Sequence, residues 1–215
     1  MTLQQIFAMS SAVLMVIGSV WQVYVAIRYP KKVRPTLASW IIFSTTLTLS
    51  FVTYWTTKER NLVSNAANAS AMVGALIVFL GALAMHIRSG NKLAFSRFQK
   101  GSLTCASLIA LVWVVMVWGL GYSGLVPNIL TQVLMIIGYC VTADKVWRAT
   151  STSESFFLWW CIFASSMLGL VPACARLDAL AILYATRATV CTGLLLILLY
   201  RIKSRSSQAS LVTVV

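Results

Sequence analysis

Seven long apolar stretches follow one another along the chain and restrict its fold more than any other feature. They span residues 4–27, 37–56, 64–87, 103–121, 126–143, 155–175 and 179–200. An α-helix needs about 20 apolar residues to cross the hydrocarbon core of a bilayer, and the stretches are close to this length. Because a chain in lipid must satisfy its backbone polar groups internally, they predict an all-α integral membrane protein with seven transmembrane helices.

The rest of the chain is too short for a soluble catalytic module. Apolar residues make up 60% of the 215 residues and charged residues 10%. We therefore expect a single transmembrane domain over residues 1–205 and a short, disordered cytoplasmic tail over 206–215. Since no Lys or Arg precedes Arg28, the first stretch is interpreted as a retained helix and not as a signal peptide.

The stretch 13–43 recurs without a gap at 133–163, which indicates an internal duplication. Nine of its 31 positions are identical: Val13/Val133, Leu14/Leu134, Met15/Met135, Ile17/Ile137, Gly18/Gly138, Arg28/Arg148, Trp40/Trp160, Ile42/Ile162 and Phe43/Phe163. We predict repeat one at about 4–87, a linker helix at about 103–121 and repeat two at about 126–200. Because the linker crosses the membrane once, both three-helix halves are expected to have the same orientation.

Basic residues gather at one end of the predicted spans. Of the 17 Lys and Arg residues, only Lys58, Arg60 and Arg176 fall in loops at the other end, and Arg187 falls within a span. This predicts an outside N-terminus and a cytoplasmic C-terminus in a plasma or bacterial inner membrane. The same pattern accounts for the net charge of +13 without nucleic acid. The expected partners are the lipid bilayer and a small-molecule solute, and homo-oligomer formation stays open.

Short motifs around the first predicted loop carry a family resemblance. They are Trp21-Gln22, Arg28-Tyr29-Pro30-Lys31-Lys32 and Thr36-Leu37-Ala38-Ser39-Trp40. These motifs resemble the SWEET and PQ-loop repeat superfamily, in particular divergent bacterial-type members. The resemblance implies seven helices in a 3+1+3 plan that carry a solute by alternating access. It also makes Pro172 a candidate hinge, together with the paired Gly18 and Gly138, which could let helices bend or approach closely.

Three asparagines near the start of the third span are spaced as on one face of a helix. They are Asn61, Asn65 and Asn68. The resemblance implies that Asn65 or Asn68 matches a sugar-pocket asparagine of the family's third helix, while the seventh-helix positions hold alanine here. Hydrogen bonding between helices is the alternative interpretation.

Arg187 is the most unusual residue of the spans. At 1.5 Å per residue from Ala179 it lies about 12 Å deep, near the middle of the membrane. We predict that it binds solute with Tyr184, one turn away, and that it favours an anionic or carbonyl-rich compound. A snorkelling side chain, or one paired with Asp178, Gln132 or a carbonyl, is the alternative.

Two further features bear on function. Trp40 and Trp160 occupy equivalent positions of the repeat and are candidates for a solute pocket, with an interfacial aromatic belt as the alternative. The four acids fall at span ends or in loops, and His86 is the one histidine. We therefore expect no enzyme, metal or cofactor, and facilitative rather than proton-coupled transport. A receptor or regulatory protein resembling the KDEL receptor is the second hypothesis, and a channel is the third.

Overall fold

The computed structural model describes the chain except for residues 31–32, 58–59, 90–93, 150–153 and 213–215, and only the backbone of residues 205–212. Its helices are α1 (Leu3–Arg28), α2 (Leu37–Trp55), α3 (Ala66–Arg88), α4 (Arg97–Val114), the π-helical turn η1 (Val115–Gly119), α5 (Leu125–Arg148), α6 (Phe156–Ala175) and α7 (Ala179–Val212). Lys31, Lys32, Lys58 and Lys92, which entered the predicted orientation, lie outside the described residues.

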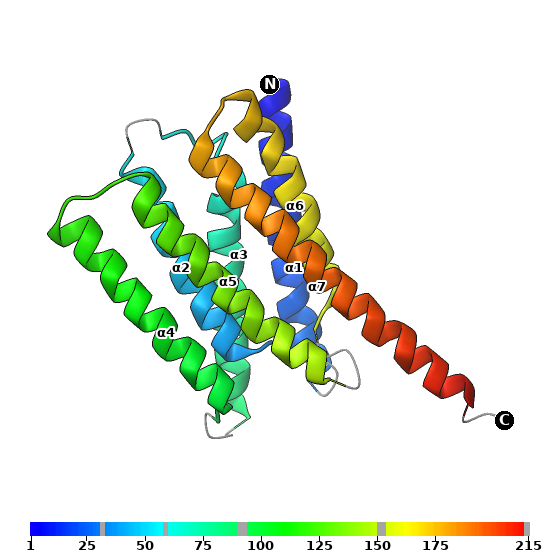
Figure 1. Cartoon of the computed structure of the whole chain (residues 1–215). Helices are drawn as coiled ribbons and strands as arrows, with labels where there is room; N and C mark the ends of the chain where they lie inside the picture. Colours follow the sequence, from blue (N-terminus) through cyan, green and yellow to red (C-terminus); the bar gives the residue numbers. More distant parts are fainter. Residues whose placement is uncertain (31–32, 58–59, 90–93, 150–153, 213–215) are drawn as a thin grey trace.

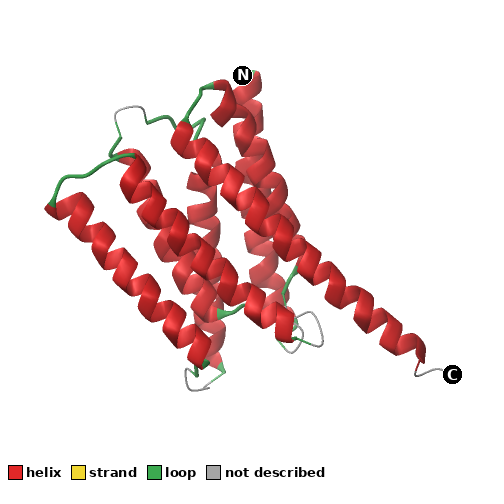
Figure 2. Cartoon of the chain, in the orientation of Figure 1, coloured by secondary structure: helices red, strands yellow, loops and turns green. Residues whose placement is uncertain are grey.

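The described residues form helices and connecting segments without strands (Figure 2). Seven of the helices, with η1 continuing α4, are long and apolar enough to cross a membrane. The prediction of an all-helical chain with seven such helices is confirmed, and this set of helices is typical of a multi-pass membrane protein.

Three helices extend well beyond the apolar stretches, namely α4, α5, which ends at Arg148, and α7. α4 begins at Arg97 rather than at 103, because Ser96 and Gln99 form a capping box: the Gln99 backbone N–H donates to Ser96 Oγ at 3.2 Å, and the Ser96 N–H donates to Gln99 Oε1 at 3.0 Å. The polar first turn of α4 hid this start from the apolar pattern. The backbone of α7 continues to Val212, past residue 205, where we expected the transmembrane domain to end and a disordered tail to begin.

The helices pack as one bundle with α4 at its edge (Figure 1). α1 packs against α3 and α6, α2 packs against α3 and α5, and α7 packs against α5 and α6, while α4 packs mainly against α5. α1, α3 and α5 end where α2, α4 and α6 begin, at the lower end in Figure 1. We call this the basic end because it carries Arg28, Arg88, Arg97, Lys100, Lys145 and Arg148, and the other is the opposite end.

The two paired glycines lie where helices approach closely. A Cβ atom on Gly18 of α1 would lie 2.6 Å from the Cβ of Cys161 on α6, and one on Gly138 of α5 would lie 2.6 Å from a ring carbon of Phe43 on α2. The expectation of close approach is therefore confirmed. Both glycines lie within continuous helices, as does the buried Pro172 of α6, so bending at any of them stays a prediction.

Candidate functional site

A small cavity lies between six of the helices. Its volume is about 30 Å³, which is enough for a water molecule but too small for an organic solute. The residues that line this central cavity are Met15 and Ser19 of α1, Trp40, Phe43 and Leu47 of α2, Ala71 and Ala75 of α3, Met135 and Tyr139 of α5, Trp159 and Ile162 of α6, and Tyr184 of α7.

Aromatic rings form much of the wall of this cavity. Trp40 stacks on Trp159 with ring centroids 6.2 Å apart and an interplanar angle of 28°, and Tyr139 lies 6.1 Å from Trp159. Trp40 and Trp159 are buried and come from different halves of the sequence. Such a wall can pack against the apolar face of a ring or chain.

Trp160, a predicted pocket residue, does not line the central cavity. Its side chain is 48% exposed and contacts Phe156 and Phe163 on the outer side of α6, while its neighbour Trp159 is 1% exposed and lines the central cavity. Consecutive residues of a helix point in directions that differ by about 100° around its axis. A shift of one position in the sequence can therefore move a side chain from the cavity to the outer surface. The repeat aligned Trp160 with Trp40, whereas packing of α6 turned Trp159 inward.

Arg187 lies in α7 beside the central cavity, between α7 and α5. Its Nε donates to Gln132 Oε1 at 2.7 Å, and Gln132 is one of the acceptors named in the alternative of a structural pairing. Its guanidinium carbon lies 4.9 Å from the ring centroid of Tyr184 and 5.9 Å from that of Tyr139, and both rings line the cavity. The side chain is only 9% exposed, so it does not extend to the surface as a snorkelling arginine would.

The charge of Arg187 is incompletely compensated. Its Nη1 and Nη2 atoms are buried and make no hydrogen bond of regular geometry among the described residues, and the side chains of Tyr139 and Tyr184 are the groups that interact with the guanidinium. Asp178, the other acceptor considered, instead binds Tyr54 and Ser64. A buried cation whose donors lack acceptors is costly, and such a residue is expected to meet an anion, a carbonyl or water.

The asparagines do not form the predicted single face. α3 begins at Ala66, Asn65 is its N-cap residue, and Asn61 lies in the preceding turn, where its Oδ1 accepts from the backbone N–H of Val63 at 2.9 Å. Asparagine often bonds to nearby backbone in this way. The Asn65 backbone N–H still donates to the Asn61 carbonyl at 3.1 Å, but Asn61 lies outside α3. Asn61 therefore shapes the turn and does not extend a stripe.

Asn65 and Asn68 are buried but lie apart from the described lining of the central cavity. Asn68 Nδ2 donates to Ser50 Oγ of α2 at 3.2 Å, while its Oδ1 and the Nδ2 of Asn65 have no partner among the described residues. The structure therefore brings Trp40, Tyr184 and Arg187 to the cavity region. It places Asn68 in the contact between α2 and α3, where it favours the alternative of hydrogen bonding between helices.

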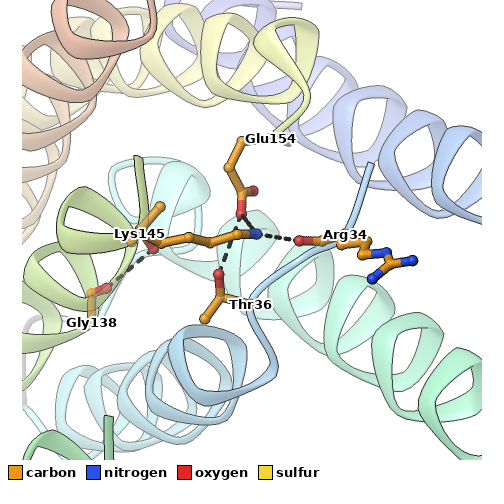
Figure 3. Close-up of polar contacts among 6 residues, drawn as sticks. Arg34, Thr36, Gly138, Lys145 and Glu154 are labelled. Carbon is orange, nitrogen blue, oxygen red and sulfur yellow. Dashed lines mark hydrogen bonds and ion pairs between the residues drawn. The ribbon is translucent and has the colours of Figure 1, made fainter. Parts of the chain in front are cut away.

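Polar contacts close the bundle at the basic end (Figure 3). Lys145 Nζ of α5 forms an ion pair of 2.7 Å with Glu154 Oε1, and it also donates to the backbone carbonyl of Arg34. Thr36 Oγ1, at the start of α2, donates to the same Glu154 oxygen at 3.4 Å. This basic-end closure joins the segment before α2 to α5 and to the segment before α6.

A second polar closure lies at the opposite end. Asp178 Oδ2, between α6 and α7, accepts from Tyr54 OH at 2.6 Å and from Ser64 Oγ at 2.5 Å. Its Oδ1 accepts from the backbone N–H of Ala181 at 3.1 Å. This opposite-end closure joins α2 and the segment before α3 to the start of α7. The sequence placed both acids in loops but gave no sign of Thr36, Tyr54 and Ser64 as their partners, each of which lies more than a hundred positions from its acid.

Three buried polar side chains lie at the central cavity or between it and the basic end. Both amide atoms of Gln22, the Oγ of Ser39 and the Nε1 of Trp159 have no hydrogen-bond partner among the described residues. Gln22 follows the cavity residue Ser19 by one turn of α1, and Ser39 precedes Trp40 in α2. Buried polar atoms of this kind mark places where water or a polar solute can bind.

Among the described residues, no group of three or more His, Cys, Asp and Glu side chains lies together in the arrangement that holds a metal ion. In comparisons with known proteins, the chain matches no family model, no curated protein and no solved structure.

Proposed function

We propose that the protein is a carrier that moves a small polar solute across a membrane by alternating access. The observation that carries the proposal is Arg187, a buried cation whose Nη atoms make no hydrogen bond of regular geometry among the described residues, beside an aromatic cavity in the middle of the bundle. The bundle is closed by polar contacts on both sides of this cavity. A central binding site between two separable closures is the arrangement that a carrier requires.

The neighbour relations of the helices support two equivalent halves, α1–α3 and α5–α7, with α4 as linker. α3 contacts α1 and α2 as α7 contacts α5 and α6, and the contacts between halves, α1 with α6 and α2 with α5, also correspond. The paired Gly18 and Gly138 lie in these two contacts. This pattern agrees with the parallel repeat of the SWEET and PQ-loop superfamily, which we propose for this chain, with the N-terminus outside.

Both closures join one proposed half to the other. Thr36 belongs to the first half and Lys145 and Glu154 to the second, while Tyr54 and Ser64 belong to the first and Asp178 to the second. In our proposal the two sets of contacts break in turn, so that the cavity widens and opens to one side at a time. The unpartnered atoms of Gln22 and Ser39 mark the route toward the basic end.

The chemistry around Arg187 points to a carboxylate or another carbonyl-rich or sugar-like solute. A guanidinium can donate two parallel hydrogen bonds to such a group, and the rings of Trp40 and Trp159 can pack on its apolar part. The described residues that line the central cavity include no acid and no histidine. This lining favours facilitative transfer over proton coupling.

Uptake into liposomes tests the proposal. The purified full-length protein is reconstituted and offered mono- and dicarboxylates, a monosaccharide and a nucleoside. Saturable exchange of one class supports a carrier. Binding without flux supports the receptor hypothesis and conductance that does not saturate supports a channel, and either result overturns the proposal.

Arg187 provides the matched variants. We expect Arg187→Ala to lower solute affinity by about tenfold to a hundredfold, as loss of a charge-assisted hydrogen bond costs about 1.5–3 kcal/mol. Arg187→Lys keeps the charge but loses the planar fork, so it should retain part of the affinity. Arg176→Ala, which removes an exposed arginine at the opposite end, is the control. Unchanged binding by Arg187→Ala would show that the cation is structural.

A further inference from the structure

A second and much larger cavity opens at the basic end. It has a volume of about 650 Å³ and lies between the last turn of α1, the first turn of α2, the last turns of α3 and the start of α4. A space of this size is typical of sites for small molecules. Its lining shares no residue with that of the central cavity, and along α1 Gln22 lies between Ser19 of the one lining and Ala26 of the other.

The charges that line this basic-end cavity are positive. Arg34, Arg88 and Lys145 all contribute to it, and the described lining includes no acid. Lys145 is already paired with Glu154, so the two arginines supply the excess charge. His86 also lines the cavity, and its Nε2 is buried without a hydrogen-bond partner among the described residues. These groups together can bind an anion.

The start of α2 adds to this positive potential. Residues Pro35 to Ala38 line the cavity, and the side chain of the N-cap residue Thr36 makes no capping hydrogen bond to the helix. Its hydroxyl donates to Glu154 instead. The first backbone N–H groups of α2 therefore lack a side-chain acceptor at the positive end of the helix dipole, which is a common place for phosphate to bind.

The remainder of the lining is apolar. Ile27, Leu37, Met85 and Phe95 form walls next to the charged groups, and Ile27 is 54% exposed on the outer surface of α1. A ligand that matches both parts carries an anionic phosphate next to an apolar chain. Basic pockets between membrane-spanning helices recognise the head groups of anionic lipids in this way.

We propose that the basic-end cavity binds a phosphate ester anion, namely the head group of an anionic phospholipid. Arg34 and Arg88 would hold the phosphate oxygens through their planar guanidinium groups, with His86 Nε2 as a further donor. The site is distinct from the proposed solute site, because none of these three residues lines the central cavity, although Arg34, Thr36 and Lys145 of its lining also form the basic-end closure. A soluble phosphate ester has the same chemistry, and the test separates the two sources.

The test measures lipid retained by the purified full-length protein in nanodiscs of phosphatidylcholine with added phosphatidylglycerol, by native mass spectrometry. We expect preferential retention of phosphatidylglycerol. The double variant Arg34→Gln/Arg88→Gln should lower this retention by about 25-fold, at about fivefold for each basic residue. Arg201→Gln removes an exposed arginine of the same end that does not line the cavity, and it should retain the lipid like the wild type.

The second arm offers glycerol 1-phosphate and inorganic phosphate to the protein in neutral detergent. If these ions stabilise the wild-type protein but not the double variant, and the wild type does not retain phosphatidylglycerol preferentially, the site binds a soluble phosphate. This result overturns the lipid proposal. Equal retention of both lipids without such stabilisation overturns the site itself, as does an equal loss in Arg201→Gln. Should the double variant aggregate, Arg88→Lys, which keeps the charge but loses the fork, should still reduce retention.

Discussion

Removing the carboxylate of Glu154 should release the basic-end closure. The Glu154 side chain is 1% exposed and Lys145 is 25% exposed, so their 2.7 Å ion pair is shielded on one side only. This pair lies within the second proposed half, and the contacts that cross to the first half are Thr36 Oγ1 to Glu154 Oε1 and Lys145 Nζ to the Arg34 carbonyl. Hydrogen bonds to charged groups stabilise by about 1.5–3 kcal/mol, and the length of the first contact and the exposure of Lys145 place these two together at about 1.5–2 kcal/mol. Glu154→Gln keeps the shape and one acceptor oxygen but removes the charge. The population open at the basic end should therefore rise roughly 10- to 30-fold.

Cysteine modification measures this opening. Ser39→Cys places a thiol on a buried position between the central cavity and the basic end, in a variant whose five native cysteines are replaced by alanine. When opening is rare and fast, the rate of modification by a charged thiol reagent follows the open population. We expect Glu154→Gln to raise this rate by the same roughly 10- to 30-fold.

Asp144→Asn is the matched control for Glu154→Gln. It removes the other described ion pair of the basic end, between Asp144 and Arg148, whose side chains are 28% and 73% exposed. Exposed pairs contribute little to stability, so the rate of modification should stay near that of the parent protein. Equal rates for the two variants, with both monodisperse, would refute the view that Lys145 and Glu154 hold the basic end closed.

Two further predictions concern packing and the cavity wall. Gly18→Leu should destabilise the protein by about 1–3 kcal/mol in thermal unfolding, because its Cβ would lie 2.6 Å from Cys161, whereas Gly101→Ala has nothing within 4 Å and should be neutral or slightly stabilising. An equal effect of both would argue against close packing of α1 on α6. Trp159→Phe should weaken solute binding severalfold in a binding titration, because Trp159 lines the central cavity. Trp160→Phe should leave binding unchanged, because Trp160 does not line it. A larger effect of Trp160→Phe would contradict this assignment.

In the candidate site, the sequence predicted how deep Arg187 lies in the membrane, but it did not predict the direction in which side chains point. Counting along α7 placed Arg187 near the middle of its span, and the structure buries it there with Gln132 as acceptor. Depth follows from the number of residues along a helix, at 1.5 Å for each. The direction in which a side chain points does not follow from this number. For this reason the sequence selected Trp160, whereas Trp159 lines the central cavity. The asparagine stripe failed because Asn61 bonds to its own turn and α3 begins later.

The sequence by itself determined that the chain is helical and that seven helices are apolar enough to cross a membrane. This follows from local composition, because hydrophobicity and helix length are properties of consecutive residues. Only the tertiary structure decided which residues meet at the centre and at the two ends. Thr36 meets Glu154, and Tyr54 meets Asp178, across more than a hundred positions of sequence. Such contacts depend on the rotation and docking of whole helices, which packing sets and which no local pattern encodes.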